Sequence, residues 1–546
     1  MALRALETHR FEVIAASENV ELLIGHTPQA LFSLYSFPDV IIVHHREGFG
    51  RRLKALHNVA PELRHPNTLD VFSTSIISCD GRSSEFWCTL HLSRGSRDVL
   101  ICEFEPVLHS GIIEKDLRKP TKKLNYQPTP EERARSITRK SIPLFALKGV
   151  QDRSSAIGTA DLISTLNEVQ GQLASSTSMN NLFDTVVGTV SELTKFDRVM
   201  LYRFDEGKCG AVVAEIVNPQ ASEDVFIGLH FPSSDLLPGT RDLYKAGRVQ
   251  ILRNRIQQTV KLVHKTGDRL AIVDLIGSYL REITPDQEQF FSDLDVSSSM
   301  TLSLIVENEL WGLITCHSYG SHITIISPPM REVCRSIGSC VASQVERLLS
   351  AERLEARILL ATALSRKSPG AFSKYPRPLC SSQIIADLQN HTVTASSSNL
   401  LEMFVADFGM LVMDDEARAI GKLQSYHEAL ALVHYFRARG VTSVFASQKI
   451  TVDLPDLEYP PGFSLIAGLL TIPLSSTGAD FLVMFRKEQL MEIHWAGNAK
   501  ERLEQLGGYN LEPREGFQRW IEHVVNTSRD WTEWQRRWNP RGLADR

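Results

Sequence analysis

Short apolar runs typical of strands alternate with amphipathic stretches near the start of the chain. Between about residues 10 and 105 the strand-like runs are FEVIAAS, DVIIVHH, EFWCTLHL and VLICEFEPV. The helical pieces among them are TPQALFSLY and GRRLKALH. This pattern predicts a small α+β domain with an antiparallel sheet, to which we assign residues 1–113.

Two further domains of the same class are predicted downstream. Residues 159–345 open with the helix ADLISTLNEVQGQLASS and continue with the expected strands RVMLYRF, GAVVAEIV, LAIVDLIG, MTLSLIVEN and LWGLITCHS. Residues 346–546 place FGMLVMDDEARAIG, VTSVFASQKI, IAGLLTIPLSS, ADFLVMFRKE and LMEIHWAGN around the helix SYHEALALVHYFRARG. The expected fold class is α+β, with three successive domains built on central antiparallel sheets with flanking helices and joined by long helices.

One long helix should connect the second domain to the third. Residues 331–366 are almost free of helix breakers, and Ile337, Val341, Val345 and Leu348 recur at helical spacing. A helix of that length would reach roughly 50 Å at 1.5 Å per residue. We expect residues 331–360 to be continuous and to serve as a rigid strut, as the seam of a parallel homodimer, or as both.

A polar segment, residues 114–158, separates the first two domains. Its part EKDLRKPTKKLNYQPTPEERARSITRK contains nine Lys or Arg and four Asp or Glu residues. Such a segment can be a patch for an anionic partner or a solvated interdomain linker, and we favour the linker.

Composition narrows the class of protein. The 546 residues are 43% hydrophobic and 23% charged, as in a soluble globular protein, and the net charge of −5 gives no reason to expect nucleic-acid binding. No apolar run approaches the roughly 20 residues of a membrane helix. The eight cysteines are scattered without zinc-like spacing, which favours reduced thiols and a cytoplasmic location.

The sequence contains none of the common catalytic motifs. There is no phosphate-binding loop, no G-x-S-x-G elbow and no H-E-x-x-H helix. The histidine pairs His44/His45 and His427/His434 lack carboxylates at ligand spacing. These observations support neither an enzyme nor a metal site.

The stretch FPSSDLLPGTRDLY, beginning at Phe231, crowds an aromatic ring, two prolines and Asp235 into one turn. Asp235 could cap the helix that follows, since a side-chain oxygen there accepts from free backbone N–H groups. It could instead face a ligand.

This stretch resembles the phytochrome segment F-P-A-S-D-I-P-x-Q-A-R-x-L-Y. FDRVMLYRFDEGKCGAVVAEIV, LREITP, SSSMTLSLIVENELWGLITCHSYG, YPPGFSLIAGLLTIPLS, DFLVMFRKEQLMEIHWAGN and EPREGFQRW are similar to phytochromes too, in the family's order. The resemblance runs from about residue 10 to about residue 535 and is closest to the fungal and bacterial branches. It identifies the three domains as PAS, GAF and PHY, with a tongue at about residues 488–522.

The resemblance implies a biliverdin-type linear tetrapyrrole in the GAF domain. Such a ligand needs an apolar slot, an acceptor for its pyrrole N–H groups and cations for its propionates. By the match, Asp235 lies under the pyrroles and Arg281 faces a propionate. The other implied contacts are Tyr202, Phe231, Phe290, Ser299, Thr301 and His317 in the GAF domain and Arg514 and Trp495 in the tongue, where Arg514 would pair with Asp235. Arg248 lies two residues before the position of a second propionate arginine and would share its strand face.

The chain departs from the family at several implied contacts. The attachment cysteine upstream of the PAS domain is absent, and the GAF attachment position reads Asp286. Gln287 replaces a histidine and Gln250 a propionate arginine. Leu237, Ser318 and Gly516 also differ from the family's residues. A truncated photoreceptor and a copy that has lost its pigment both remain open.

We therefore expect a red/far-red photoreceptor module that binds a bilin weakly or non-covalently and relays its light state through long helices. Cys316 should face away from the slot, because adjacent strand residues point to opposite faces. The alternative is a pigment-free, phytochrome-derived scaffold for dimerisation or partner docking.

Overall fold

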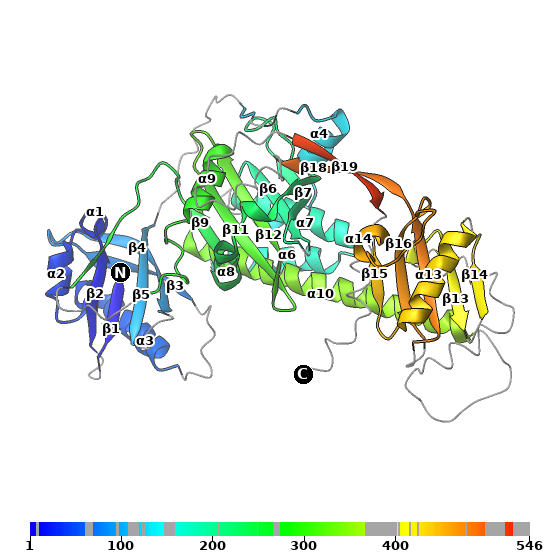
Figure 1. The fold of residues 1–546 in the computed structure, drawn as a ribbon. Coiled ribbons are helices and arrows are strands. Elements are labelled where there is room, and N and C mark those ends of the chain that lie inside the picture. Colours follow the sequence, from blue (N-terminus) through cyan, green and yellow to red (C-terminus); the bar gives the residue numbers. More distant parts are fainter. Residues whose placement is uncertain are drawn as a thin grey trace. The chain divides into compact units, whose positions relative to one another are not determined.

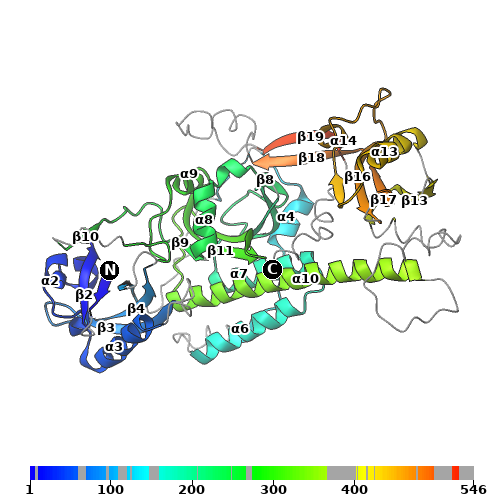
Figure 2. The same ribbon diagram turned by 60° about the horizontal axis from the view of Figure 1, so that its bottom comes forward.

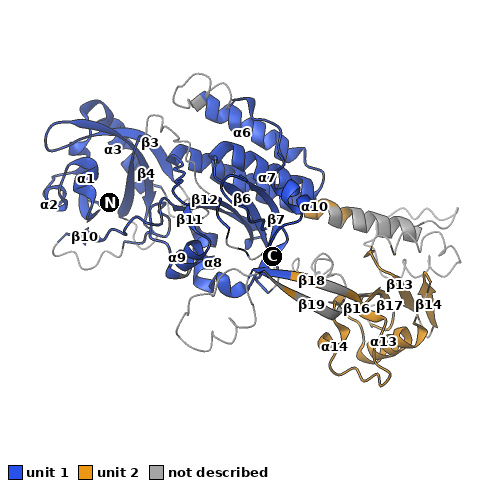
Figure 3. Cartoon of the chain, turned by 90° about the horizontal axis from the view of Figure 1, so that it is seen from above, with its two compact units in different colours: residues 1–348, 494–520 blue, residues 349–493, 521–546 orange. Residues whose placement is uncertain are grey.

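The structure is a computed structural model. It describes residues 1–6, 10–59, 69–93, 98–107, 120–122, 124, 126–146, 159–205, 207–247, 249–265, 273–365, 401, 404–413, 416–422, 425–474, 478–496 and 519–527. The chain divides into two compact units (Figure 3). Unit 1 contains Met1–Leu348 and His494–Trp520, and unit 2 contains Leu349–Ile493 and Ile521–Arg546.

The first sheet of unit 1 is antiparallel and has the order β10-β2-β1-β5-β4-β3 (Figure 1). Its strands are β1 (Ala2–Ala5), β2 (Phe11–Ser17), β3 (Asp70–Ile77), β4 (Ser83–Leu92), β5 (Val99–Pro106) and β10 (Leu262–His264). The accompanying helices are α1 (Val20–Ile24), α2 (Pro28–Phe32), η1 (Phe37–Val40) and α3 (Val43–His57). Phe37, Phe49 and Phe86 are buried where these helices pack on the sheet.

The second sheet of unit 1 has the order β19-β18-β8-β7-β6-β12-β11-β9. Its strands are β6 (Arg198–Phe204), β7 (Gly210–Val217), β8 (Leu229–Phe231), β9 (Val249–Leu252), β11 (Val296–Val306), β12 (Glu309–Tyr319), β18 (Gln489–Ala496) and β19 (Arg519–Thr527). Around it lie α4 (Pro130–Ile137), α6 (Thr159–Ala174), α7 (Met179–Thr194), η3 (Ser233–Asp235), α8 (Pro238–Gly247), α9 (Pro285–Asp293) and α10 (Pro328–Ser365). Figure 2 shows α8 and α9 on one side of the sheet and α7 and α10 on the other.

The two sides of the second sheet differ in chemistry because side chains alternate along β11. An added Cβ at Gly338 of α10 would touch Leu302, so Leu302 faces the long helix. Ser303 Oγ donates to the Tyr244 carbonyl of α8, 2.7 Å away, so Ser303 faces the opposite side. Because strand side chains alternate, Ser299, Thr301 and Ser303 lie on the α8 side of β11, and Met300, Leu302 and Leu304 lie on the α10 side.

The expected long helix is confirmed, because α10 runs from Pro328 to Ser365. The contribution of this helix to a parallel dimer stays a prediction, but the apolar stripe that suggested it is not free for such a contact. Ile337, Val341 and Val345 are 0% exposed and Leu348 is 5% exposed within the single chain. The stripe is therefore consumed by packing inside unit 1, and any contact with a second copy needs another surface.

The polar segment between the first two domains is not simply solvated. Leu124 and Leu144 are buried, and so is Ser136 of α4, whose hydroxyl donates to Glu215 at 3.0 Å. The Leu124 backbone N–H donates to Asp224. The described part of this segment thus packs on the second sheet through Leu124 and Ser136, and its Arg139 and Lys140 form ion pairs with Glu192 and Asp184 of α7.

The strand expected for LAIVDLIG is also wrong where the structure describes it, at residues 273–277. Val273 packs against a small cluster of the first sheet that includes Ile14 and Val99. The Asp274 N–H donates to Ser93 Oγ at 3.1 Å. These apolar residues follow no strand period, because they dock onto the neighbouring sheet.

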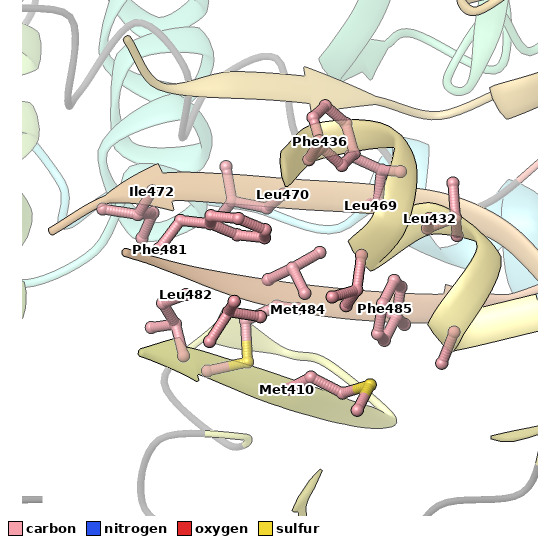
Figure 4. Close-up of a cluster of buried hydrophobic side chains, with 14 of the residues drawn as sticks. Met410, Leu432, Phe436, Leu469, Leu470, Ile472, Phe481, Leu482, Met484 and Phe485 are labelled. Carbon is pink, nitrogen blue, oxygen red and sulfur yellow. The ribbon is translucent and has the colours of Figure 1, made fainter. Parts of the chain in front are cut away.

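Unit 2 has a five-stranded sheet of order β14-β13-β17-β16-β15. Its elements are β13 (Phe408–Met413), β14 (Glu416–Ile420), α13 (Tyr426–Arg439), β15 (Phe445–Ser447), α14 (Ile450–Asp453), β16 (Ile466–Pro473) and β17 (Phe481–Lys487). Figure 4 shows Leu432 and Phe436 of α13 among the apolar side chains of this sheet. Buried Glu428 accepts from the backbone N–H of Leu465 and Ile466, which ties α13 to the start of β16.

No helix among the described residues is long and apolar enough to cross a membrane.

Candidate functional site: a cavity beneath α8 and α9

A cavity of about 610 Å³, including its open mouth, lies on the hydroxyl-rich side of the second sheet. Its walls are formed by Tyr202, Phe204, Lys208, Gly210, Phe231, Pro232, Asp235, Leu236, Tyr244, Gln287, Phe290, Phe291, Thr301, Leu313, Thr315 and His317. Of these, only Lys208 and Asp235 carry a charge at neutral pH, and Lys208 is exposed.

Asp235 reaches the cavity from a tight turn. Strand β8 ends at Phe231, Pro232 precedes the 3-10 turn η3, and α8 begins only at Pro238. Arg241 of α8 donates through Nη2 to the Ser233 carbonyl at 2.6 Å, which ties the turn to the helix. Asp235 therefore lies too early to be the N-cap of α8, and its carboxylate lines the cavity instead.

A connected series of rings lines the cavity. The ring centroids of Tyr202 and Phe231 are 5.3 Å apart, and those of Phe231 and Phe290 are 6.0 Å apart. Phe290 is followed by Phe291 at 5.9 Å, and Phe291 by His317 at 5.7 Å. Such tilted and edge-to-face pairs hold one another in place and present flat apolar surface to a ligand.

Burial keeps two ionisable groups of the wall, His317 and Tyr202, neutral. Desolvation, reinforced by the positive charge of Arg198, lowers the pKa of His317 to about 3. Desolvation first, and then the charge of Asp235, raise the pKa of Tyr202 well above its ordinary value. His317 is thus a neutral imidazole and Tyr202 a neutral phenol at physiological pH.

Several buried polar atoms beside the cavity lack a hydrogen-bond partner among the described residues. They are Tyr202 Oη, Ser299 Oγ, Thr315 Oγ1 and His317 Nδ1. Ser299 and His317 are cross-strand neighbours, as are Thr301 and Thr315. Leaving such a group unsatisfied costs about 1–3 kcal/mol. A flat ligand with polar groups along its edge fits this wall, because it could satisfy these atoms while its apolar faces contact the rings.

Comparison with known proteins agrees with this geometry. A family model described as GAF domain matches residues 178–349, and one described as Phytochrome region matches residues 375–539. Cyanobacterial phytochrome A of Nostoc is 27% identical over 373 residues, covering 66% of this chain and 45% of the relative. A bacteriophytochrome of Xanthomonas campestris is 28% identical over 348 residues, covering 62% of this chain and 52% of the relative. The chain is thus similar to phytochromes over both its GAF and its PHY region.

Solved phytochrome structures have the same fold. The photosensory core module of Stigmatella aurantiaca phytochrome superposes with a TM-score of 0.71 at 22% identity, covering 98% of this chain and 93% of that one. A bacteriophytochrome from R. palustris superposes with a TM-score of 0.70 at 22% identity, covering 97% and 91%. The matches to curated phytochromes span about half of those relatives' length. The expected α+β class with three successive domains is confirmed.

The phytochrome-like residues expected from the sequence fall into three groups. Tyr202, Phe231, Asp235, Phe290, Thr301 and His317 line the cavity, and Ser299 is buried beside His317. Arg281 is half-buried in the loop before α9 but is not part of the wall, and desolvation lowers its pKa. Arg248 and Arg514 lie outside the described residues.

Trp495 belongs to β18, which joins the second sheet in parallel beside β8. Trp495 is in register with His230, and the two ring centroids are 5.7 Å apart. This part of the predicted tongue therefore meets the strand that leads into the Asp235 turn.

The resemblance to phytochromes did not single out Tyr244, Phe291 or Thr315 as wall residues. Thr315 could have been found from the strand period, because Leu313, Thr315 and His317 share one face of β12. Phe291 follows Phe290 on a helix, and two successive helical residues are not both expected to face one cavity.

No cysteine is among the cavity-lining residues. Cys316 is fully buried, and burial together with neighbouring Cys334 of α10 raises its thiol pKa, which agrees with a side chain directed away from the cavity. Cys209 is half-buried between Lys208 and Gly210, which both line the cavity. Within the described part of the chain, no cluster of three or more His, Cys, Asp or Glu residues could hold a metal ion.

Proposed function

We propose that this chain is the light-sensing module of a phytochrome-like photoreceptor and holds a biliverdin-type linear tetrapyrrole non-covalently in the cavity. The observation that carries the proposal is the combination in one wall of Asp235, a connected series of aromatic rings and buried polar atoms without partners. Binding of a flat, conjugated, N–H-rich ligand would use all three features.

Each feature has a distinct task in the proposed complex. The Asp235 carboxylate accepts hydrogen bonds from pyrrole N–H groups, and such charge-assisted bonds are the strong ones. Neutral His317 can donate or accept through Nδ1, depending on its tautomer. Tyr202, Phe231 and Phe290 pack on the faces of the rings. Arg281, and with it Arg248, is proposed to meet the propionates.

The bound tetrapyrrole would supply red-light absorption and isomerisation. The chain's part in the relay is proposed to run through the tongue and the long helices. Trp495 would report changes at the Asp235 turn through β8, and Arg514 would pair with Asp235 in the dark state.

The proposed domain division is PAS-like for residues 1–113, linker for 114–158, GAF for 159–345 and PHY for 346–546. In this proposal the module carries no catalytic domain, acts in the cytoplasm and forms a homodimer. The dimer contact would use exposed apolar residues such as Ile142, Phe145 and Ile163 rather than the buried stripe of α10. Sedimentation at tens of micromolar tests this, since a monomer there would exclude the dimer.

Reconstitution tests the proposal directly. Biliverdin added to the purified chain should give a far-red absorbance band, and Asp235→Asn should weaken binding by about tenfold or more, since a charge-assisted hydrogen bond is lost. Asp242→Asn is the matched control, because Asp242 is exposed on α8 and does not line the cavity.

The attachment mode is read after denaturation. Acid urea should separate all pigment from the polypeptide. A zinc-fluorescent protein band on a denaturing gel would overturn non-covalent binding and direct attention to Cys209. A wild-type chain without any absorbance band would overturn the photoreceptor proposal and favour the pigment-free scaffold.

A further inference from the structure

Two glutamines, Gln250 of β9 and Gln287 of α9, form a buried amide pair at the edge of the cavity. Gln287 is 5% exposed and Gln250 is 9% exposed. Gln287 Nε2 donates to Gln250 Oε1 at 3.2 Å and to Tyr244 Oη at 2.8 Å. Buried amides need a hydrogen-bond partner for each polar atom. It must therefore be established which end of each amide, the oxygen or the NH₂ group, faces which neighbour.

The direction of the Gln287 amide follows from the start of α9. Thr284 and Gln287 form a capping box, in which the Thr284 backbone N–H donates to Gln287 Oε1 at 3.1 Å. A backbone N–H can only donate, so the atom facing it must be the oxygen. The Gln287 NH₂ group is therefore directed away from Thr284, toward Gln250 and Tyr244.

The direction of the Gln250 amide follows in turn. Because an NH₂ group of Gln287 faces it, Gln250 must present its oxygen there, and a flip would place two NH₂ groups against each other. The Gln250 NH₂ group then has no acceptor among the described residues. Its position is nevertheless set by Gln287 and, through Gln287, by the capping box.

The Gln250 NH₂ group belongs to the cavity side of the sheet. Gln250 is the cross-strand partner of Thr301, which lines the cavity, and opposed residues on paired strands point to the same face. Its contact Gln287 lines the cavity as well. A buried donor of fixed direction thus lies beside the ligand space.

We propose that Gln250 is a ligand-binding residue, whose Nε2 donates a hydrogen bond to an acceptor oxygen of the bound tetrapyrrole, and that Gln287 is the positioning residue that holds this donor in place. The proposal rests on the proposed function. The proposal assigns a neutral, directional donor to the part of the wall formed by β9 and β11. The two charged lining residues, Lys208 and Asp235, lie on neither strand.

The affinity for biliverdin, measured by absorbance titration, tests both roles. Gln250→Leu should lower the affinity about tenfold, because the donor to the ligand is lost. Gln250→Glu should bind still more weakly, because the carboxylate presents an acceptor where the wild type presents a donor. Circular dichroism confirms that each variant is folded.

Positioning is tested by a double-mutant cycle. Gln287→Leu alone should weaken binding, and the variant with both substitutions should bind no more weakly than Gln250→Leu alone, since Gln287 acts through Gln250. Gln289→Leu is the matched control, because Gln289 lies on the same helix and pairs with Asp293 on its exposed side.

The outcomes distinguish a failure of the proposed function from a failure of the roles assigned to Gln250 and Gln287. A wild-type chain that binds no biliverdin overturns the proposed function and this assignment with it. A wild type that binds while Gln250→Leu binds equally well, or Gln250→Glu binds more tightly, leaves the proposed function standing and overturns the donor role. Additive losses in the cycle overturn the positioning role of Gln287.

Discussion

Replacing Arg331 by Met should destabilise unit 1 more than any exposed charge removal on the same helix. The Arg331 guanidinium makes a bidentate pair with Glu105 of β5, with Nη1–Oε1 at 2.5 Å and Nη2–Oε2 at 2.8 Å. Arg331 is 0% exposed and the Glu105 side chain 5% exposed. This pair joins the first sheet to the beginning of α10.

The magnitude follows from burial. Among the described residues, Arg331→Met leaves the buried Glu105 with Arg253, at 3.4 Å, as its remaining cation. Removing one partner of a buried ion pair costs about 3–5 kcal/mol, because the other charge remains desolvated. The guanidinium also lies 5.2 Å from the Tyr279 ring centroid, a contact that Met replaces in part. We expect a loss near the lower end of the range, about 3 kcal/mol.

Urea unfolding followed by fluorescence and by far-UV circular dichroism measures the loss. Arg335→Met is the matched control, since Arg335 lies one turn further along α10 and pairs with Glu332 at a partly exposed position. Such pairs contribute about 0–1 kcal/mol. The reasoning is refuted if Arg331→Met costs no more than Arg335→Met. A second check is Glu105→Leu combined with Arg331→Met, which should be more stable than either single variant because no buried charge remains unpaired.

Two smaller perturbations concern a crowded glycine and a buried histidine of unit 1. Gly312→Ala should lower the thermal midpoint markedly, because a Cβ there would lie 2.3 Å from the Tyr202 carbonyl oxygen. Gly50→Ala, on α3 in open space, should instead raise the free energy of unfolding by about 0.5–1 kcal/mol. Equal effects of the two substitutions on the thermal midpoint would contradict this prediction. His317 has a folded pKa of about 3 against about 6.5 when unfolded, so the unfolded chain binds the extra proton and stability should fall as pH drops from 6.5 to 3. His317→Phe should flatten that part of the stability–pH curve, and an unchanged slope would show that another group titrates there.

The hydrophobic pattern along the chain predicted helices and strands better than it predicted the surfaces against which they pack. The freedom from breakers after residue 331 correctly indicated one helix, but an apolar stripe carries no information on which surface it covers. The stripe of Ile337 and Val341 therefore looked like a dimer seam and proved to be core. The strand expected at residues 273–277 failed for the same reason, because docking onto another sheet produces an apolar run without a strand's period.

The cavity itself was predictable only in part. Asp235, Phe231 and His317 were identified from motifs of the family, and their place in the wall follows from strand alternation and one tight turn. The pairing of Gln250 with Gln287 was not predictable, since the two residues are 37 positions apart and belong to a strand and a helix. Taken singly, Gln250 is the loss of an arginine contact and Gln287 the loss of an imidazole contact. Together they form one neutral arrangement.

That arrangement bears on the choice between a photoreceptor and a pigment-free scaffold. A scaffold that needs only its fold gains nothing from buried polar atoms without partners, because replacing them by apolar groups of similar shape is neutral or stabilising. Here Tyr202, Ser299, Thr315 and His317 retain such atoms beside one cavity, and Gln250 adds a fifth whose direction is set by its neighbours. The free-energy cost of these unsatisfied atoms is explained most simply if a ligand with complementary polar groups occupies the cavity. In that case Gln250 and Gln287, which replace an arginine and a histidine, indicate a different set of hydrogen bonds to the ligand rather than the loss of the ligand.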